Sequence, residues 1–255
     1  MRVSKSSSRG KAAPPPNKRR TFALAGRSAK LDGRINAYRS DIADIALADR
    51  VFAPYYAVPV VRETIADVAD LHKSPSGDSE LGSQLLQGET FAVLDSINGW
   101  SWGYATRDHY VGYVRNSALG GIAQPVPVAG DGDADIVSVA ETLLDAPYLW
   151  GGRSAAGIDC SGLVQFALAA AGISAPRDSD LQLETLGSDI AEGDNLRRGD
   201  LIFFPDHVGI MTDAERLVHA TRHWGKVVIE PLAGVVARIA AEHPVPVIGR
   251  RRIAR

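Results

Sequence analysis

Residues 147–162 read Pro-Tyr-Leu-Trp-Gly-Gly-Arg-Ser-Ala-Ala-Gly-Ile-Asp-Cys-Ser-Gly, and they contain the single cysteine of the chain, Cys160. The next residues, 163–171, are mostly good helix formers, and Gly172 ends the run. Cys160 is therefore predicted at a helix N-terminus, where free backbone N–H groups and the helix dipole favour the nucleophilic thiolate. A lone cysteine is also commonly an inert buried residue, so the rest of the sequence has to decide between the two.

The length and composition predict two globular domains. The chain has 255 residues, more than one domain usually contains, and 45% of them are hydrophobic. Its formal net charge of −2 provides no global field that would recruit nucleic acid or an anionic membrane. The single cysteine excludes an intramolecular disulfide and a multi-cysteine metal site, and it fits a reducing compartment.

Residues 1–30 are expected to form a disordered basic tail. Residues 1–20 contain Lys, Arg, Ser and Pro but no acid, and such a segment cannot bury enough apolar area to fold. Arg19-Arg20-Thr-Phe-Ala-Leu resembles a twin-arginine export signal, but the apolar part is shorter than the ~7–15 residues of a signal core. No run approaches the ~20 apolar residues of a membrane span. We therefore expect a cytoplasmic protein.

Residues 31–59 are expected to be a lead-in segment, in which Ile42, Ile45 and Leu47 give a weak helical face that predicts a short helix. Residues 122–135 are rich in Pro and Gly and lack periodicity, which is typical of a linker.

Residues 60–121 are predicted to form a small antiparallel β barrel. Short β-branched or aromatic runs alternate with turn signals such as Asn98-Gly99. Tryptophans and tyrosines in such a domain are more often core residues than a ligand platform. The expected strands are Val60–Thr64, Ala66–Leu71, Leu81–Leu86, Thr90–Ile97, Trp100–Ala105 and Tyr110–Val114.

Residues 136–255 are predicted to form an α+β domain, because helices come first and a run of strands follows. A helical pattern covers Ile136–Leu144, and the Cys160 helix comes next. The expected strands are Leu201–Phe204, His207–Met211, Arg216–Ala220, Val227–Glu230 and Val245–Gly249.

A cysteine nucleophile needs a base to take its proton and a group to orient that base. The chain has six histidines. His207 begins a predicted strand and His219 falls in the next, so a hairpin would bring the two rings together. The second imidazole would fix the tautomer of His207 and support an ion pair with the thiolate of Cys160. Each histidine taken alone could equally be an ordinary surface or core residue.

The motifs of this half strongly resemble the NlpC/p60 family of papain-like cysteine peptidases. They are Pro147-Tyr-Leu-Trp-Gly-Gly152, Asp159-Cys-Ser-Gly162, Arg198-Gly-Asp-Leu201, His207-Val-Gly-Ile210 and His219-Ala220. The resemblance implies that Cys160 is the nucleophile, His207 the base and His219 the orienting residue. It also implies that Tyr148 helps to hold the oxyanion, and that no metal or cofactor is needed.

The first half resembles bacterial SH3-like domains, in which a Gly-Trp strand precedes a Gly-Tyr-Val strand. With the motifs Trp150-Gly-Gly-Arg-Ser154 and Pro176-Arg-Asp-Ser179, the two halves together look most like γ-D-glutamyl-L-diamino-acid endopeptidases of the dipeptidyl-peptidase VI type. The resemblance implies that Asp159 and Ser161 bind a free substrate amine, and that Glu80 and Tyr110 of the SH3-like domain close the same pocket. Asp159 has a second interpretation as a helix N-cap.

The resulting expectation is a peptidase that cleaves γ-D-glutamyl bonds to diaminopimelate or lysine in wall-derived peptides with a free N-terminal L-alanine. Such peptides are the substrates of wall recycling. Two alternatives stay open: a wall-binding module or hydrolase that acts on intact peptidoglycan, and a papain-like amidase or acyltransferase. No nucleic acid or membrane partner is expected.

Overall fold

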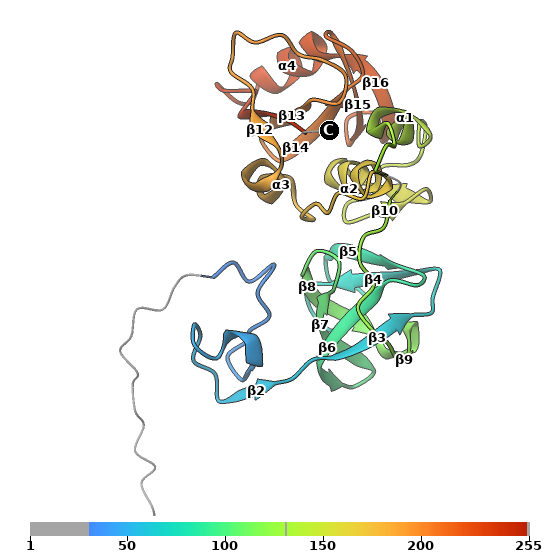
Figure 1. Cartoon of the computed structure of the whole chain (residues 1–255), viewed down its shortest axis with the longest axis vertical. Helices are drawn as coiled ribbons and strands as arrows, with labels where there is room; N and C mark the ends of the chain where they lie inside the picture. Colours follow the sequence, from blue (N-terminus) through green and yellow to red (C-terminus); the bar gives the residue numbers. More distant parts are fainter. Residues whose placement is uncertain (1–30, 131, 254–255) are drawn as a thin grey trace, which may run out of the picture.

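The computed structural model describes residues 31–130 and 132–253. It divides into a β domain with the lead-in segment beside it and an α+β domain that follows (Figure 1). The expected basic tail, residues 1–30, lies outside the described residues. Within the described ranges, no helix combines the length and the hydropathy of a membrane span.

The β domain is one seven-stranded antiparallel sheet in the order β5-β4-β8-β7-β6-β3-β9. All six predicted strands are present, four of them with the predicted bounds, because alternating side chains face a core that includes Leu71, Leu85 and Phe91. The strands are β3 (Val60–Thr64), β4 (Val68–His72), β5 (Leu81–Leu86), β6 (Thr90–Ile97), β7 (Trp100–Ala105), β8 (Val111–Arg115) and β9 (Leu119–Ile122). A 3-10 helix, η2 (Asn116–Ala118), precedes β9.

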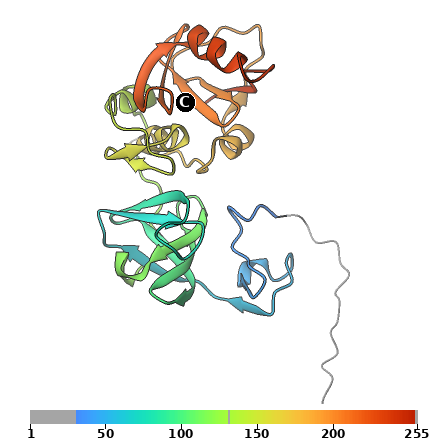
Figure 2. The ribbon, with the colours of Figure 1, turned by 180° about the vertical axis from the view of Figure 1, so that it is seen from behind.

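The lead-in segment is extended rather than helical, so the predicted short helix is wrong apart from one 3-10 turn, η1 (Ile45–Leu47). Strand β1 (Ile42–Asp44) pairs in parallel with β2 (Tyr55–Ala57). Ile42 and Ala57 pack with the buried Trp102 of the β domain, and this tertiary contact outweighs the weak helical pattern. Figure 2 shows the segment beside the β domain from behind.

The α+β domain has a six-stranded sheet in the order β12-β17-β13-β14-β15-β16. Its strands are β12 (Ser188–Asp189), β13 (Leu201–Phe204), β14 (His207–Met211), β15 (Arg216–Thr221), β16 (Lys226–Pro231) and β17 (Gly249–Arg252). Both faces are covered: Leu201 and Phe203 belong to one core cluster, and Ile202 and Phe204 to another. Full burial explains why β13 is apolar at every position.

Helices cover the two faces of this sheet. Helices α1 (Ile136–Glu141) and α2 (Cys160–Ala170) pack on one face, and α4 (Leu232–Ala240) packs on the other through Val235. Helix α3 (Ser179–Thr185) adjoins α2, and the two-residue strands β10 (Arg153–Ser154) and β11 (Gly157–Ile158) precede α2. The sequence predicted α1 and α2 but neither α3 nor α4.

The predicted last strand, Val245–Gly249, is wrong, since the observed strand is β17 (Gly249–Arg252). Pro244 and Pro246 have no backbone N–H, so this stretch cannot donate a regular ladder of hydrogen bonds. β17 instead pairs with both β13 and β12.

A buried polar network joins the two domains. The side chain of Arg153 is only 4% exposed, and it forms ion pairs of 2.8 Å with both carboxylate oxygens of Glu89 in the β domain. Burial alone would raise the pKa of Glu89, but hydrogen bonds and charge from Arg153 lower it to about 2. Gly151 lies against β5 with φ 78°, and a Cβ there would come within 2.8 Å of the Leu81 carbonyl oxygen. The domains therefore meet along the edge that leads to Cys160.

Candidate active site

Cys160 is the first residue of α2, as the sequence predicts. The Asp159 carboxylate caps the helix by accepting a 2.7 Å hydrogen bond from the backbone N–H of Gly162. Cys160 is 6% exposed, and it lines a cavity between the two domains. The thiol is buried, but a substrate in the cavity could reach it.

The backbone N–H groups at the start of α2 favour the thiolate of Cys160, as expected, but other influences on its pKa are stronger. Burial, followed by the negative charge of Asp159, raises the pKa of Cys160 to about 12. Backbone N–H groups of Val208 and Ser161 favour the charged form but are outweighed. At neutral pH the sulfur is therefore a thiol that needs a base.

His207 and His219 lie on adjacent strands, as predicted from the hairpin. The turn Pro205-Asp206 joins β13 to β14 with Asp206 in the left-handed region at φ 54°, and His207 follows directly. His207 Nε2 lies 2.7 Å from His219 Nδ1. The structure thus brings the two imidazoles together beside the Val208 backbone that faces Cys160.

The sequence interpretation did not identify Glu230, which extends this chain of contacts. Its carboxylate lies 2.8 Å from His219 Nε2, and Arg238 of α4 binds the same carboxylate. Burial alone would raise the pKa of Glu230, but the hydrogen bond from Arg238 and the charge of His219 hold it below its usual value. An ionised carboxylate only accepts hydrogen bonds, so His219 donates through Nε2.

The tautomers of both rings follow from that constraint. His219 donates its Nε2–H to Glu230, so its Nδ1 accepts the Nε2–H of His207. The lone pair of neutral His207 is then on Nδ1, the ring nitrogen left for a proton from Cys160.

Both imidazoles are neutral in the resting site. Burial, together with the neighbouring His219, lowers the pKa of His207 to about 3. Burial also lowers the pKa of His219 to about 4, although Glu230 opposes the shift. A buried neutral imidazole can accept a proton, which is the property a general base requires.

Tyr148 lies on the approach to α2 and is held by backbone contacts. Its N–H donates 2.8 Å to the Gly225 carbonyl, and it forms an isolated bridge with Ile158. Burial, then the charges of Cys160 and Asp159, raise its pKa, so the hydroxyl keeps its proton and remains a donor.

The cavity beside Cys160 has a volume of about 390 Å³ and takes one wall from each domain. Five carboxylates and two cations line it, so its charge is net negative. All four residues predicted to bind substrate line it: Glu80, Tyr110, Asp159 and Ser161. The carboxylates are Glu80, Asp159, Asp178, Asp180 and Asp206, and the cations are Arg34 and Lys73.

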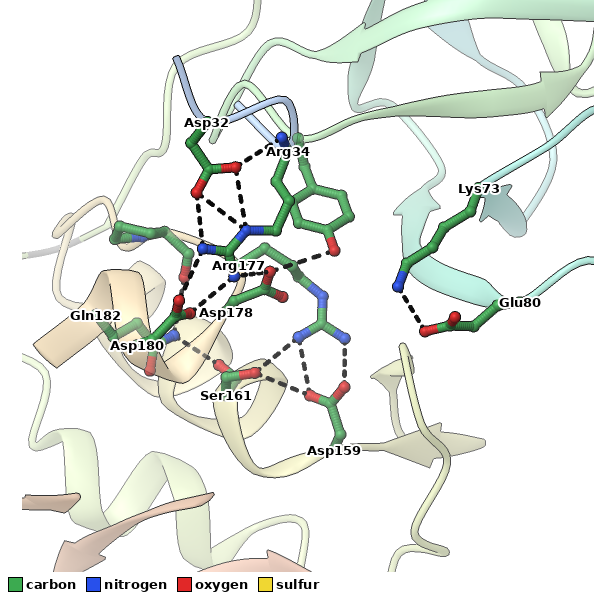
Figure 3. Close-up of polar contacts among 12 residues, drawn as sticks. Asp32, Arg34, Lys73, Glu80, Asp159, Ser161, Arg177, Asp178, Asp180 and Gln182 are labelled. Atoms are coloured by element: carbon green, nitrogen blue, oxygen red, sulfur yellow. Dashed lines mark hydrogen bonds and ion pairs between the residues drawn. The ribbon is translucent and has the colours of Figure 1, made fainter. Parts of the chain in front are cut away.

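Asp159 and Ser161 are already engaged by a buried arginine that the sequence interpretation did not single out (Figure 3). Arg177 is 1% exposed and donates to both Asp159 oxygens, at 2.5 and 2.9 Å, and to Ser161 Oγ at 2.9 Å. It also reaches Ser83 of β5 at 3.1 Å. Arg177 therefore neutralises Asp159 and ties the start of α2 to the β domain.

Glu80 and Tyr110 contribute to this cavity from the β domain. The Glu80 side chain is 50% exposed and binds Lys73 at 2.6 Å, and Trp150 Nε1 donates to it at 3.3 Å. Tyr110 is buried, and its hydroxyl donates to Asp178 Oδ2 at 3.3 Å.

Asp178 and Arg34 are further groups that the sequence interpretation missed at this site. Arg34, from the lead-in segment, binds Asp178 at 2.9 Å and Asp180 at 2.7 Å (Figure 3). Burial raises the pKa of Asp178, although Arg177 and Arg34 oppose the shift. The motif Pro176-Arg-Asp-Ser179 marks Asp178 in the sequence, but no local signal marks Arg34, which is 144 residues away.

Residues 145–239 match the model of the NlpC/P60 family. The chain carries a domain of the NlpC/P60 family. Residues 71–119 match the model of the bacterial dipeptidyl-peptidase SH3 domain, so both predicted resemblances are confirmed.

Two curated relatives are similar to parts of this NlpC/P60 chain. Dipeptidyl-peptidase 6 of Lysinibacillus sphaericus is 37% identical over 34% of this chain and 32% of the relative. A gamma-D-glutamyl-L-lysine dipeptidyl-peptidase of Bacillus cereus is 32% identical over 42% of this chain and 33% of the relative. The matches thus span about a third of each relative's length.

A solved NlpC/P60 family protein from Bacillus cereus has 24% sequence identity to this chain and a TM-score of 0.40. The match covers 76% of this chain and 63% of that one.

Proposed function

We propose that this protein is a cysteine peptidase that hydrolyses the γ-D-glutamyl bond to a diamino acid in peptides derived from bacterial peptidoglycan. The observation that carries the proposal is the neutral His207–His219–Glu230 relay, which begins next to Val208, the residue whose backbone faces the thiol of Cys160. The name of the Bacillus cereus relative, a gamma-D-glutamyl-L-lysine dipeptidyl-peptidase, supports the bond type.

In the first half-reaction the Cys160 sulfur attacks the carbonyl carbon at the γ position of D-glutamate. Nδ1 of His207 takes the thiol proton, and His219 with Glu230 stabilises the imidazolium that forms. Tyr148 donates to the oxyanion of the tetrahedral intermediate. The carbon–nitrogen bond then breaks, His207 returns its proton to the leaving amine, and a thioester remains on Cys160.

Water completes the cycle. His207 takes a proton from the water as its oxygen attacks the thioester carbonyl, and the same proton returns to the sulfur when the carbon–sulfur bond breaks. The products are the shortened peptide with a γ-carboxylate and the free thiol, so no oxidant or metal enters the balance.

The net negative cavity supports a substrate with a free amino group. Partly buried carboxylates favour a bound ammonium, and Asp178, whose side chain is 25% exposed, lies there beside Tyr110. The β domain lines this side of the cavity with Glu80, Gly82 and Tyr110, so a glycan on the L-alanine amine would collide with it. We therefore propose free wall peptides as substrates, recycled in the cytoplasm, rather than the intact wall.

The test is the hydrolysis of L-Ala-γ-D-Glu-L-Lys and its diaminopimelate counterpart. Cys160→Ala should abolish release of L-Ala-γ-D-Glu while unfolding cooperatively near the wild-type temperature, and His207→Ala should do the same. Retained hydrolysis by Cys160→Ala would overturn the nucleophile assignment. Wall binding without cleavage by the wild-type protein would favour a binding module instead.

A further inference from the structure

A second cavity of about 500 Å³ lies on the histidine side of the site. His207 and His219 form part of its wall, and it shares Trp150, Pro205 and Asp206 with the first cavity. A peptide that passes Cys160 would therefore occupy both cavities, one on each side of the scissile bond.

The position of His207 identifies which half of the substrate enters the second cavity. A general acid must be within hydrogen-bond reach of the nitrogen that it protonates. Since His207 returns its proton to the leaving amine, the leaving diamino acid lies on the side that His207 lines. The acyl half, with its free amine, lies in the first cavity.

Arg222 stands in this second cavity without an acidic partner. The turn that carries it is fixed, because Tyr148 N–H donates to Gly225 at 2.8 Å and Gly225 has φ 66°. The guanidinium carbon lies 5.3 Å from the centre of the Trp150 ring and 5.8 Å from that of Tyr148. Among residues 31–130 and 132–253, no carboxylate lies within ion-pairing distance of Arg222.

The other arginines of the site differ from Arg222 in this respect. Arg34, Arg177 and Arg238 each form ion pairs with carboxylates of the chain. Two aromatic rings therefore hold the guanidinium of Arg222 in place, but no carboxylate of the described residues neutralises its charge. A guanidinium binds a carboxylate through two parallel N–H groups, so an anionic group of a ligand would supply the ion-pair partner that Arg222 lacks.

The two cavities also differ in charge. The first has five carboxylates against two cations, and even with Asp159 paired to Arg177 it stays net negative, whereas the second has two arginines against two carboxylates, and its His207 and His219 are neutral. This contrast favours a peptide with its ammonium in the first cavity and an anionic group in the second.

We propose that Arg222 binds the carboxylate of the leaving diamino acid, next to the scissile bond. This inference rests on the proposed function and adds the polarity of the substrate to it. The preferred substrate is a short peptide with a free amine at one end and a free carboxylate on the diamino acid. A chain that continues through that carboxylate as an amide lacks the anion and binds less well.

The test compares L-Ala-γ-D-Glu-L-Lys with the same peptide carrying a C-terminal carboxamide, which removes one negative charge. The variants are Arg222→Gln, Arg222→Lys and, as a matched control, Arg115→Gln. Arg115 also stacks on a tryptophan, 4.0 Å from the ring centre of Trp100, but lies in the β domain away from both cavities. Product release is followed by liquid chromatography with mass detection, and thermal unfolding checks the fold of each variant.

The wild-type protein should prefer the carboxylate peptide by about 10-fold in kcat/KM, mostly through KM, in the range of a partly exposed charged hydrogen bond. Arg222→Gln should abolish the preference by raising KM for the carboxylate peptide alone, Arg222→Lys should keep part of it, and Arg115→Gln should match wild type. A preference that survives in Arg222→Gln would overturn the inference. Equal wild-type cleavage of both peptides would overturn it and leave the proposed function standing, whereas cleavage of neither would overturn the proposed function itself.

Discussion

His219 lies 2.8 Å from the carboxylate of Glu230, and this contact sets the direction of every hydrogen bond back to His207. Glu230→Ala removes this acceptor, so His219 and His207 are no longer held in one tautomer each. We expect kcat to fall by about 10- to 100-fold, a part of the ~10²–10⁴ that general acid–base catalysis contributes. Glu230→Gln keeps an acceptor oxygen and should lose less.

Nitrogen-15 NMR of the imidazoles separates this effect from general damage. The His219 signals should change from one protonated Nε2 to a mixture of tautomers in Glu230→Ala. His72, whose Nδ1 contacts the Ser79 carbonyl at 2.9 Å in the β domain, should be unaffected in the same spectra. Unchanged His219 signals with unchanged kcat would refute the relay.

The raised pKa of Cys160 predicts a distinctive reaction with iodoacetamide. Because burial and Asp159 raise that pKa to about 12, the thiolate fraction is smaller than in an ordinary thiol at every pH below it. Alkylation of the free protein, followed by intact mass, should accelerate with pH up to at least pH 10. A rate that has already reached its plateau at pH 7 would mean that the resting site is an ion pair.

Asp178 should matter more than Glu80 for the substrate amine. The Asp178 side chain is 25% exposed and Glu80 is 50% exposed, and a less solvated charge interacts more strongly. Asp178→Asn should raise KM for the free-amine peptide by more than 10-fold, and Glu80→Gln by about threefold or less. Steady-state kinetics would measure both.

Asp178→Asn also weakens a contact with Arg34, and Asp180→Asn is the control for that loss. Asp180 binds Arg34 at 2.7 Å but leaves the Tyr110–Asp178 contact in place. Its effect on KM should therefore be small. An effect of Asp180→Asn as large as that of Asp178→Asn would indicate that Arg34, rather than Asp178, determines binding.

Glu89→Gln should destabilise the protein by removing the buried ion pair that Glu89 forms with Arg153 across the interface of the two domains. Removing one partner of a buried ion pair costs about 3 kcal/mol, since the other charge stays buried without its partner. Urea unfolding should show this loss at pH 7, while Glu63→Gln on an exposed position of β3 should change little. A loss below about 0.5 kcal/mol would contradict the role assigned to Arg153 and Glu89.

The pH dependence of that stability has a definite sign. The pKa of Glu89 is about 2 in the folded protein, below its ordinary value of 4.5. Its contribution is therefore complete above pH 4.5 and is lost as the pH falls from 4.5 towards 2. The gap between wild type and Glu89→Gln should narrow over that window, and a constant gap would count against the ion pair.

The sequence predicted those strands and helices whose residue patterns are visible over a few neighbouring positions. Six of the seven strands of the β domain, all but β9, and β13 to β16 were predicted because alternation, apolar runs and turn residues are visible in the sequence. Helix α4 was missed because it contains Gly234 and the β-branched Val235 and Val236, which do not favour a helix. Packing of Val235 beneath the sheet stabilises it.

The residues of the candidate site also fall into those that the sequence could predict and those that it could not. Cys160, His207 and His219 could be predicted from the order of a helix and a hairpin. Glu230 could also have been found, because the register pairs His219 with Val228 and places Glu230 diagonally opposite on the same face. Arg34 could not, since domain packing brings it to Asp178, which is 144 residues away, whereas Arg177 belongs to the same motif as Asp178.

The most direct measurement of the central claim is mass spectrometry of the products from one tripeptide, L-Ala-γ-D-Glu-diaminopimelate, supplied with a free and with an acetylated L-alanine. The wild-type protein should release L-Ala-γ-D-Glu from the free peptide at least 100-fold faster than the acetylated product from its counterpart, and Cys160→Ala should release neither. Equal cleavage of the two peptides, or cleavage by Cys160→Ala, would contradict the account.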